Sequence, residues 1–227
     1  MQGDLFATKG LEYLVVVGYL LVLVATLKLA APRLARAFGT KAPRSVARPA
    51  PWFSLAAGYH YHPAHSWVAP SEGVVVTVGL DDFAAQLVGP PDGLELPPVG
   101  ASMRQGERGW SVRVGGRTLP MIAPVDGTVV AVNQAVLDAP RLATEDPYGE
   151  GWLMKVGAPN APASLRNLLS GELASVWMRH TAERLSRLPA AGLGVVMADG
   201  GAPVRGFGRT LGPEEWQAVV REFFLGD

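Results

Sequence analysis

The sequence predicts an α+β protein with a single N-terminal transmembrane helix, a β-rich domain and C-terminal helices. Three observations support this prediction. An apolar run occupies residues 13–31, short strand-like runs separated by Gly, Pro and Asp turns extend from Tyr59 to about Gly157, and apolar residues at helical spacing follow within 163–188. The middle pattern is typical of a small sandwich or barrel.

Length and composition limit the possible functions. The chain has 227 residues, of which 48% are hydrophobic and 18% charged, enough for one core or two small domains. The formal net charge is zero, so no bulk positive field attracts nucleic acid, and we expect no nucleic-acid partner. The chain has no cysteine, which excludes disulfides, thiolate metal sites and a thiol nucleophile.

The apolar run at 13–31 is interrupted only by Lys28 and approaches the roughly 20 residues that cross a bilayer. The alternatives are a cleaved signal peptide and a buried core helix. A signal peptide carries positive charge in front of its apolar region, whereas here Asp4 and Glu12 flank Lys9. The sequence therefore favours an uncleaved membrane anchor.

The charges around this run predict its direction. Basic residues follow the apolar core of the run, and no acidic residue appears after it until Glu72. Positive charge stays on the cytoplasmic side, so we expect a single-pass membrane protein whose C-terminal domain is cytoplasmic. The cations can also contact anionic headgroups of the lipid bilayer. They are Lys28, Arg33, Arg36, Lys41, Arg44 and Arg48.

The β-rich region begins after a segment rich in Ala, Pro and Arg that shows neither helical nor strand period and is predicted to be a stiff tether. A short helix is expected over Asp81–Val88, with the acidic pair Asp81-Asp82 at its cap. The expected strands are Gly73–Leu80, Ser111–Val114, Thr118–Ile122, Thr128–Asn133 and Trp152–Val156.

The C-terminal part is predicted to contain a helix over 163–188 with Ser164 as N-cap, then two extended runs around a turn at 199–201, and a last helix over Pro213–Leu225. The extended runs are Leu193–Met197 and Val204–Arg209. The predicted segments are the extracytoplasmic N-terminus (1–12), the transmembrane helix (13–31), the tether (32–58), the β domain (59–160), the C-terminal helix (161–190) and a small hairpin and helix unit (191–227).

Several motifs in residues 59–170 resemble the H protein of the glycine cleavage system, a lipoyl-carrying family. They are Tyr61 with His65-Ser66-Trp67-Val68, Val78-Gly79-Leu80-Asp81-Asp82-Phe83-Ala84, Leu96-Pro97 with Val99-Gly100, Ala123-Pro124-Val125-Asp126-Gly127 through Val132-Asn133, Leu137-Asp138-Ala139-Pro140, and Glu145-Asp146-Pro147-Tyr148-Gly149-Glu150-Gly151-Trp152-Leu153. The resemblance implies a barrel-sandwich hybrid with a C-terminal helix, in which a hairpin turn exposes a lysine amidated by lipoate.

This lysine is missing. In the family it stands about seven residues before the position matched by Ala123, which is about Gly116 here. The only lysines of the chain are Lys9, Lys28, Lys41 and Lys155. Arginine cannot replace lysine, because its guanidinium stays protonated and delocalised. We therefore expect a degenerate member of the family with no lipoyl group, no other cofactor and no glycine cleavage activity.

The residues at the missing lysine are candidates for partner binding. Val114-Gly115-Gly116-Arg117 has the composition of a two-residue turn, since glycines accept positive φ. Arg113 and Arg117 lie on either side of the turn and allow two interpretations. The tip is a compact cationic knob that binds carboxylates or the acidic surface of a partner, or it is an ordinary solvated turn. The candidate partner-binding residues are Arg113, Gly115, Gly116 and Arg117.

Other motifs give weaker indications. His60, His62 and His65 invite a metal interpretation, but in an extended chain His65 points away from the other two, so no metal site is predicted. The Gly-rich stretch 206–212 lacks the strand-turn-helix setting of a dinucleotide site, and no serine lies in a nucleophile-elbow context. No catalytic residues are predicted, and we expect a protein that is not an enzyme.

The last helix has many apolar residues for its length, including Trp216, Phe223 and Phe224, which predicts either core packing or a docking face. Together these features predict a membrane-anchored, non-catalytic accessory or assembly subunit that binds other protein subunits of a membrane-bound enzyme complex. The alternatives are a lipoyl or acyl carrier and an anion- or metal-binding module.

Overall fold

The computed structural model describes residues 18–19, 52–187 and 204–225. The chain divides into residues 1–50 and 51–227, and the folded domain belongs to the second unit. The predicted transmembrane helix at 13–31 lies outside the described residues apart from Gly18 and Tyr19. Within the part of the chain that is described, no helix is both long enough and apolar enough to cross a membrane.

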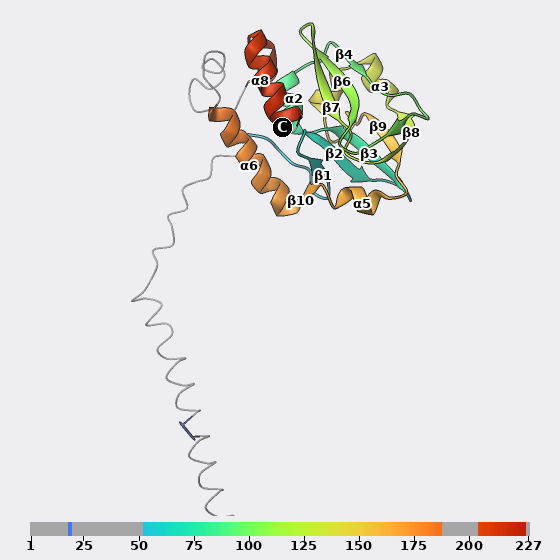
Figure 1. Ribbon diagram of the computed structural model, residues 1–227, viewed down its shortest axis with the longest axis vertical. Coiled ribbons are helices and arrows are strands. Elements are labelled where there is room, and N and C mark those ends of the chain that lie inside the picture. The colour runs from blue at the N-terminus through green and yellow to red at the C-terminus, as the bar shows by residue number, and fades with distance from the viewer. Residues whose placement is uncertain (1–17, 20–51, 188–203, 226–227) are drawn as a thin grey trace, which may run out of the picture. The chain divides into compact units, whose positions relative to one another are not determined.

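The larger of two sheets has seven antiparallel strands (Figure 1). Four of them form its centre through the antiparallel pairs β2–β3, β3–β9 and β9–β8, and the last of these pairs shifts register between Val129 and Ala131. In the order of the sheet the strands are β10 (Leu169–Ser170), β1 (His60–His62), β2 (Ser66–Pro70), β3 (Val75–Leu80), β9 (Met154–Gly157), β8 (Gly127–Val132) and β5 (Ser102–Met103).

The smaller sheet has three antiparallel strands in the order β4 (Gly93–Glu95), β6 (Arg108–Val114) and β7 (Arg117–Ile122). Strand β6 alternates between buried and more accessible residues over its second half, as expected for a strand with one face on the core. Its pairing with β7 shifts register between Arg108 and Trp110. The hairpin of β6 and β7 positions the candidate site.

Both sheets contribute to one hydrophobic core. Val78 and Met154 of the large sheet and Val112 and Leu119 of the small sheet are all fully buried in the same cluster. Each such side chain contributes roughly 1.5–3 kcal/mol to the free energy of unfolding. The predicted β domain is thus confirmed as a two-sheet β sandwich with helices attached to it.

The short helix α2 (Asp82–Val88) confirms the predicted helix at 81–88. The Asp81 carboxylate caps it by accepting a hydrogen bond of 2.9 Å from the backbone N–H of Ala84. The other helices are α3 (Gln134–Asp138), α4 (Leu142–Glu145), α5 (Ala161–Leu165), α6 (Gly171–Arg187), the 3-10 helix η1 (Phe207–Thr210) and α8 (Pro213–Phe224).

The single helix predicted over 163–188 is wrong, because strand β10 separates α5 from α6. Leu169 pairs with Tyr61, so these residues extend the large sheet instead of continuing a helix. Ser164 is not an N-cap. It is buried inside α5, where its hydroxyl accepts a hydrogen bond of 3.3 Å from the backbone N–H of Asp126.

The last helix is confirmed as α8 (Pro213–Phe224), but the extended run predicted over Val204–Arg209 is wrong. Instead, residues 207–210 form η1, whose preceding Gly206 has a φ of 82°. The run predicted over 193–197 and the turn at 199–201 lie outside the described residues. Figure 1 shows α8 beside the β6–β7 hairpin. The apolar face of α8 is buried in the core and consists of Trp216, Val219, Val220, Phe223 and Phe224.

Candidate functional site

The tip of the β6–β7 hairpin is a two-residue turn, as predicted. Val114 pairs with Arg117, and between them Gly115 and Gly116 have φ values of 56° and 76°. Two consecutive positive φ angles match the twist of the flanking strands and favour glycine at both positions. A Cβ atom added at Gly116 would meet no atom within 4 Å, so position 116 is open to solvent.

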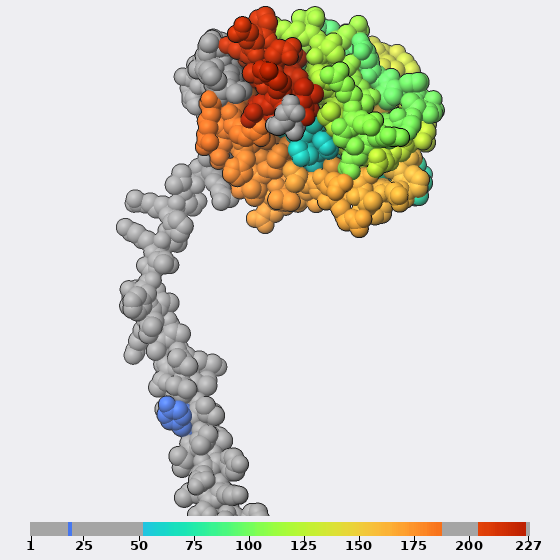
Figure 2. Space-filling model, in the orientation of Figure 1, coloured from blue at the N-terminus to red at the C-terminus, as the bar shows by residue number. Residues whose placement is uncertain are grey.

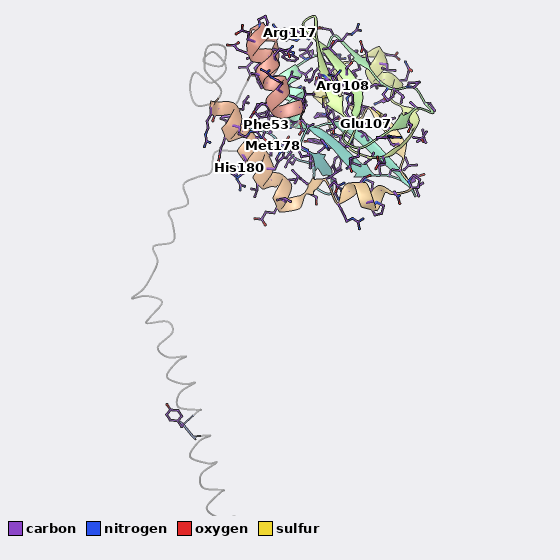
Figure 3. The ribbon with its side chains drawn as sticks, in the orientation of Figure 1. Phe53, Glu107, Arg108, Arg117, Met178 and His180 are labelled. Atoms are coloured by element: carbon purple, nitrogen blue, oxygen red, sulfur yellow. The ribbon has the colours of Figure 1, made fainter. Side chains whose placement is uncertain are left out.

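The two arginines that flank this turn have different surroundings. Arg117 donates hydrogen bonds to the carbonyl oxygens of Leu211, at 2.8 Å, and Gly208, at 3.4 Å. Its guanidinium also lies 5.5 Å from the ring centroid of Trp216, a favourable cation–π arrangement. Figure 3 shows Arg117 at the tip of the hairpin next to α8. Its hydrogen bonds therefore fix the hairpin to residues 204–225, the C-terminal segment.

Arg113 is exposed and makes no such contacts. Its guanidinium lies across Gly93 of the neighbouring strand, where a Cβ atom would collide with it. Of the predicted partner-binding residues, Arg113, Gly115 and Gly116 are exposed, whereas Arg117 is half-buried against the chain's own C-terminal segment.

Asp92 joins the tip to η1. Its carboxylate accepts hydrogen bonds from the backbone N–H of Gly115 and, at 2.9 Å, from the guanidinium of Arg209. The hydrogen bond from Arg209 lowers the pKa of Asp92, with a smaller contribution from the Gly115 N–H. Asp92 therefore remains ionised near neutral pH and holds Gly115 and Arg209 together.

The residues of this hairpin do not fit a lipoyl group. Attachment of lipoate requires a primary amine, and residues 108–122 contain none. The only lysine in the described ranges is Lys155, which belongs to β9 of the other sheet. Its ammonium nitrogen lies 5.4 Å from the ring centroid of Trp152.

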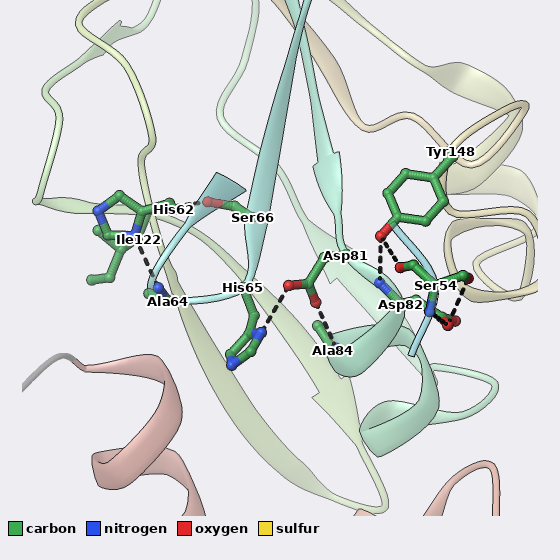
Figure 4. A network of polar contacts seen from close by, with 10 residues as sticks. All are labelled: Ser54, His62, Ala64, His65, Ser66, Asp81, Asp82, Ala84, Ile122 and Tyr148. Atoms are coloured by element: carbon green, nitrogen blue, oxygen red, sulfur yellow. Dashed lines mark hydrogen bonds and ion pairs between the residues drawn. The ribbon is translucent and has the colours of Figure 1, made fainter. Parts of the chain in front are cut away.

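In the His-Tyr-His-Pro-Ala-His stretch, His62 and His65 have different hydrogen-bond partners. His65 is buried with a φ of 63°, and its Nδ1 lies 2.7 Å from the Asp81 carboxylate (Figure 4). His62 accepts a hydrogen bond of 3.0 Å from the backbone N–H of Ala64, and burial followed by the proximity of His65 lowers its pKa to about 4. Nowhere in the described residues do three His, Asp or Glu side chains form a group suited to a metal ion.

A polar network around α2 was not predicted from the sequence. The backbone N–H and the hydroxyl of Ser54 both donate to the Asp82 carboxylate, at 2.7 and 2.9 Å. The Tyr148 hydroxyl accepts from the Asp82 N–H at 3.1 Å and donates to the Ser54 carbonyl at 2.8 Å (Figure 4). Burial raises the pKa of Tyr148, so its hydroxyl keeps the proton it donates.

This network attaches residues that the sequence assigns to the tether. Phe53 is buried in the core, with its ring centroid 5.0 Å from that of Phe83 in α2. No local sequence pattern indicates this packing, because Phe53 and Phe83 lie far apart in the chain. The acidic pair Asp81-Asp82 was predicted only as a helix cap, yet each carboxylate has its own tertiary partner.

Comparison with known proteins agrees with the geometry of the fold. Residues 59–181 match the model of the glycine cleavage H-protein family. A glycine cleavage system H protein of Thermobifida fusca is 42% identical over 112 residues, which cover 49% of this chain and 88% of the relative. One from Synechococcus sp. RCC307 is 43% identical over 110 residues, covering 48% of this chain and 82% of the relative.

Among solved structures, a glycine cleavage system H protein from Mycobacterium marinum matches with a TM-score of 0.49 and 29% identity over 56% of this chain and 99% of its own. The two-sheet domain with its protruding hairpin is an H-protein-like β domain. The family model matches more than half of the chain, and the chain therefore belongs to the glycine cleavage H-protein family.

Proposed function

We propose that this protein is a non-lipoylated, non-catalytic member of the H-protein family that acts as an accessory or assembly subunit of a membrane-bound enzyme complex. Residues 13–31 would anchor it in the bilayer and leave the β domain in the cytoplasm. One observation supports the loss of the carrier role above all others: a Gly115–Gly116 turn without an amine stands where the family resemblance places the lipoyl lysine.

The chemistry of acylation explains why this turn matters. A neutral primary amine must attack an activated acyl group, and neither glycine nor arginine provides one. Arg117 is in addition held by two carbonyl oxygens and the Trp216 ring. A swinging arm at this tip would therefore require a residue that the chain does not have there.

The alternative function is that of a carrier with an acyl or lipoyl group on another residue. Lys155 is the one candidate in the described residues, but it lies within a paired strand and its ammonium contacts an aromatic ring. Both features restrict the reach that a carrier arm needs. We therefore favour an interaction role over a carrier role.

The exposed side of the hairpin tip is our candidate for the partner-binding surface. It presents Arg113 and the backbone of Gly115 and Gly116, whereas the other side contacts the C-terminal segment. The Gly115 N–H is already bonded to Asp92, so the Arg113 guanidinium is the donor offered to a partner. A guanidinium is suited to carboxylates, which favours an acidic surface on the partner.

Intact mass of the full chain, purified from cells grown with lipoate, tests the loss of the carrier role. We expect the mass of the unmodified sequence, and a lipoyl increment on any lysine would overturn the proposal.

Extraction from membranes in mild detergent tests the subunit role. We expect a stoichiometric companion that the Arg113→Glu variant loses and an Arg166→Glu control retains, because Arg166 is exposed directly after α5 and away from the tip. Purification without any companion would contradict it.

A further inference from the structure

Residues 204–225 lie beyond the part of the chain that matches the family, which ends at residue 181. We call them the C-terminal segment, consisting of η1, α8 and the residues around them. Figure 2 shows this segment in red, lying directly against the green hairpin strands and the orange helix α6. The family domain of this chain therefore has one face that a later part of the same chain covers.

The apolar contacts of the segment reach the centre of this face. The ring centroids of Phe223 and Phe224 lie 5.1 and 6.0 Å from that of Phe83 in α2. The Phe224 ring also lies 5.3 Å from His65. Trp216 is buried about two turns earlier on the same side of α8, so the helix presents an aromatic stripe to the domain.

The backbone of the segment fits closely against the C-terminal end of α2. The N–H of Gly206 donates a hydrogen bond of 2.6 Å to the carbonyl oxygen of Gln86. A Cβ atom at Gly89 would lie 2.6 Å from the Cα of Gly206, and one at Gly208 would lie 2.7 Å from the carbonyl oxygen of Leu87. Glycines at these positions allow an approach that other residues would prevent.

Polar contacts at both ends of the segment involve partly accessible side chains. At the hairpin end they are the Arg117 hydrogen bonds and the Arg209–Asp92 ion pair, whose side chains are 35% and 45% exposed. At the other end Arg184 of α6 forms an ion pair of 2.6 Å with Glu222. Exposed ion pairs contribute little to stability, so these contacts orient the segment more than they stabilise it.

We propose that the C-terminal segment is an intramolecular ligand that closes a helix-binding face of the H-protein domain, formed by α2, β7 and α6. When the segment is displaced, this face binds an amphipathic helix of a partner protein that carries an aromatic stripe like that of α8. The segment and the partner helix then compete for one face, and the segment acts as an autoinhibitory contact.

The test uses a fluorescently labelled peptide of residues 204–225 as the probe and the full chain in detergent as the receptor. Val220→Asp places a charge on the buried side of α8 and alters only the occupant, not the face. Gln217→Asp adds the same charge on the exposed side of the same helix and is the matched control. Fluorescence anisotropy measures peptide binding, and hydrogen exchange of residues 213–224 measures displacement of the segment.

We expect V220D to bind the peptide at least tenfold more tightly than the wild type and Q217D do. A peptide that itself carries V220D should not bind. Adding Arg117→Ala to the V220D chain should weaken binding of the wild-type peptide by about tenfold, because the bonds to two carbonyl oxygens and the cation–π contact are lost.

Three results would overturn the proposal: equal binding by wild type and V220D, no binding by a folded V220D chain, or unchanged hydrogen exchange of α8 in V220D. The last would make the segment a fixed part of the core. If V220D does not fold, Trp216→Ala loosens the segment more mildly and is judged by the same criteria. None of these results bears on the intact mass or the companion protein, so failure here leaves the proposed function in place.

Discussion

The carbonyl oxygen of Gln86 accepts a hydrogen bond of 2.6 Å from the N–H of Gly206. The side-chain amide of the same glutamine donates one of 3.0 Å to the carbonyl oxygen of Trp52. One residue of α2 thus binds both the segment that precedes the family domain and the segment that follows it. Because both flanking segments attach to α2, this helix is where changes in one segment are expected to affect the other.

Restoring a lysine at the turn should restore its capacity to be acylated. We expect the Gly116→Lys chain to gain a lipoyl increment in intact mass after treatment with a lipoate ligase, because position 116 is open to solvent. A side chain at a φ of 76° costs about 1 kcal/mol, which should lower Tm by a few degrees. Thr118→Lys puts a lysine on an exposed position of β7 and is the control. Lipoylation of T118K but not G116K would show that the turn does not correspond to the carrier position.

Loss of His65 should leave the Oδ2 atom of the buried Asp81 carboxylate without its partner, while Oδ1 keeps its hydrogen bond from the Ala84 N–H. We expect His65→Ala to lower the free energy of unfolding by about 3 kcal/mol, since both side chains are almost completely buried. His65→Asn should be less harmful, because asparagine tolerates the positive φ and its amide can donate to Asp81. Denaturant unfolding measures both values. Equal losses for the two variants would contradict a role for the hydrogen bond.

Stability should depend on pH through His62. Burial lowers its pKa to about 4 in the folded chain from an unfolded value of 6.5, so the unfolded chain binds the proton first. The free energy of unfolding should therefore fall as the pH decreases from 6.5 to 4. His62→Asn retains an acceptor for the Ala64 N–H but does not titrate. As the pH falls from 6.5 to 4, the wild type should therefore lose more unfolding free energy than H62N does. An equal change in both proteins would contradict the prediction.

The hydroxyl of Tyr148 should fix the start of the folded domain. Tyr148→Phe removes a group that bonds both the Asp82 N–H and the Ser54 carbonyl. We expect a loss of about 1–3 kcal/mol in unfolding free energy and faster hydrogen exchange in residues 52–56. Tyr59→Phe, whose hydroxyl donates only to the Tyr148 carbonyl, is the control and should leave that exchange unchanged. Equal exchange in Y148F and wild type would exclude this role.

The features that were predicted correctly are those determined by residues adjacent in the sequence. The Gly115–Gly116 turn, the Asp81 cap of α2 and the Pro213 start of α8 each follow from the local preference of one or two residue types. The helix predicted over 163–188 failed where Leu169 pairs with Tyr61, which lies far away in the chain. A strand pairing of this kind overrides local helical spacing.

The surroundings of the candidate site could not be predicted for the same reason. Arg117 has the composition of an exposed turn residue, but its hydrogen-bond acceptors, Gly208 and Leu211, lie more than 90 positions later. Phe53 lies in a proline-rich stretch without periodicity, yet it packs on Phe83. Only the folded chain shows that Phe53 is buried and Arg117 half-buried.

The pairing of His60 with Ser170 has a consequence for synthesis of the protein on the ribosome. Strand β1 emerges early and can pair with β2 at once, but its outer edge has no partner until residue 170 has also emerged from the ribosome. An unpaired strand edge is a site of aggregation, and long-range pairing forms slowly. Nascent chains stalled before residue 170 has left the ribosome should therefore depend on chaperones more strongly than chains stalled after it has left.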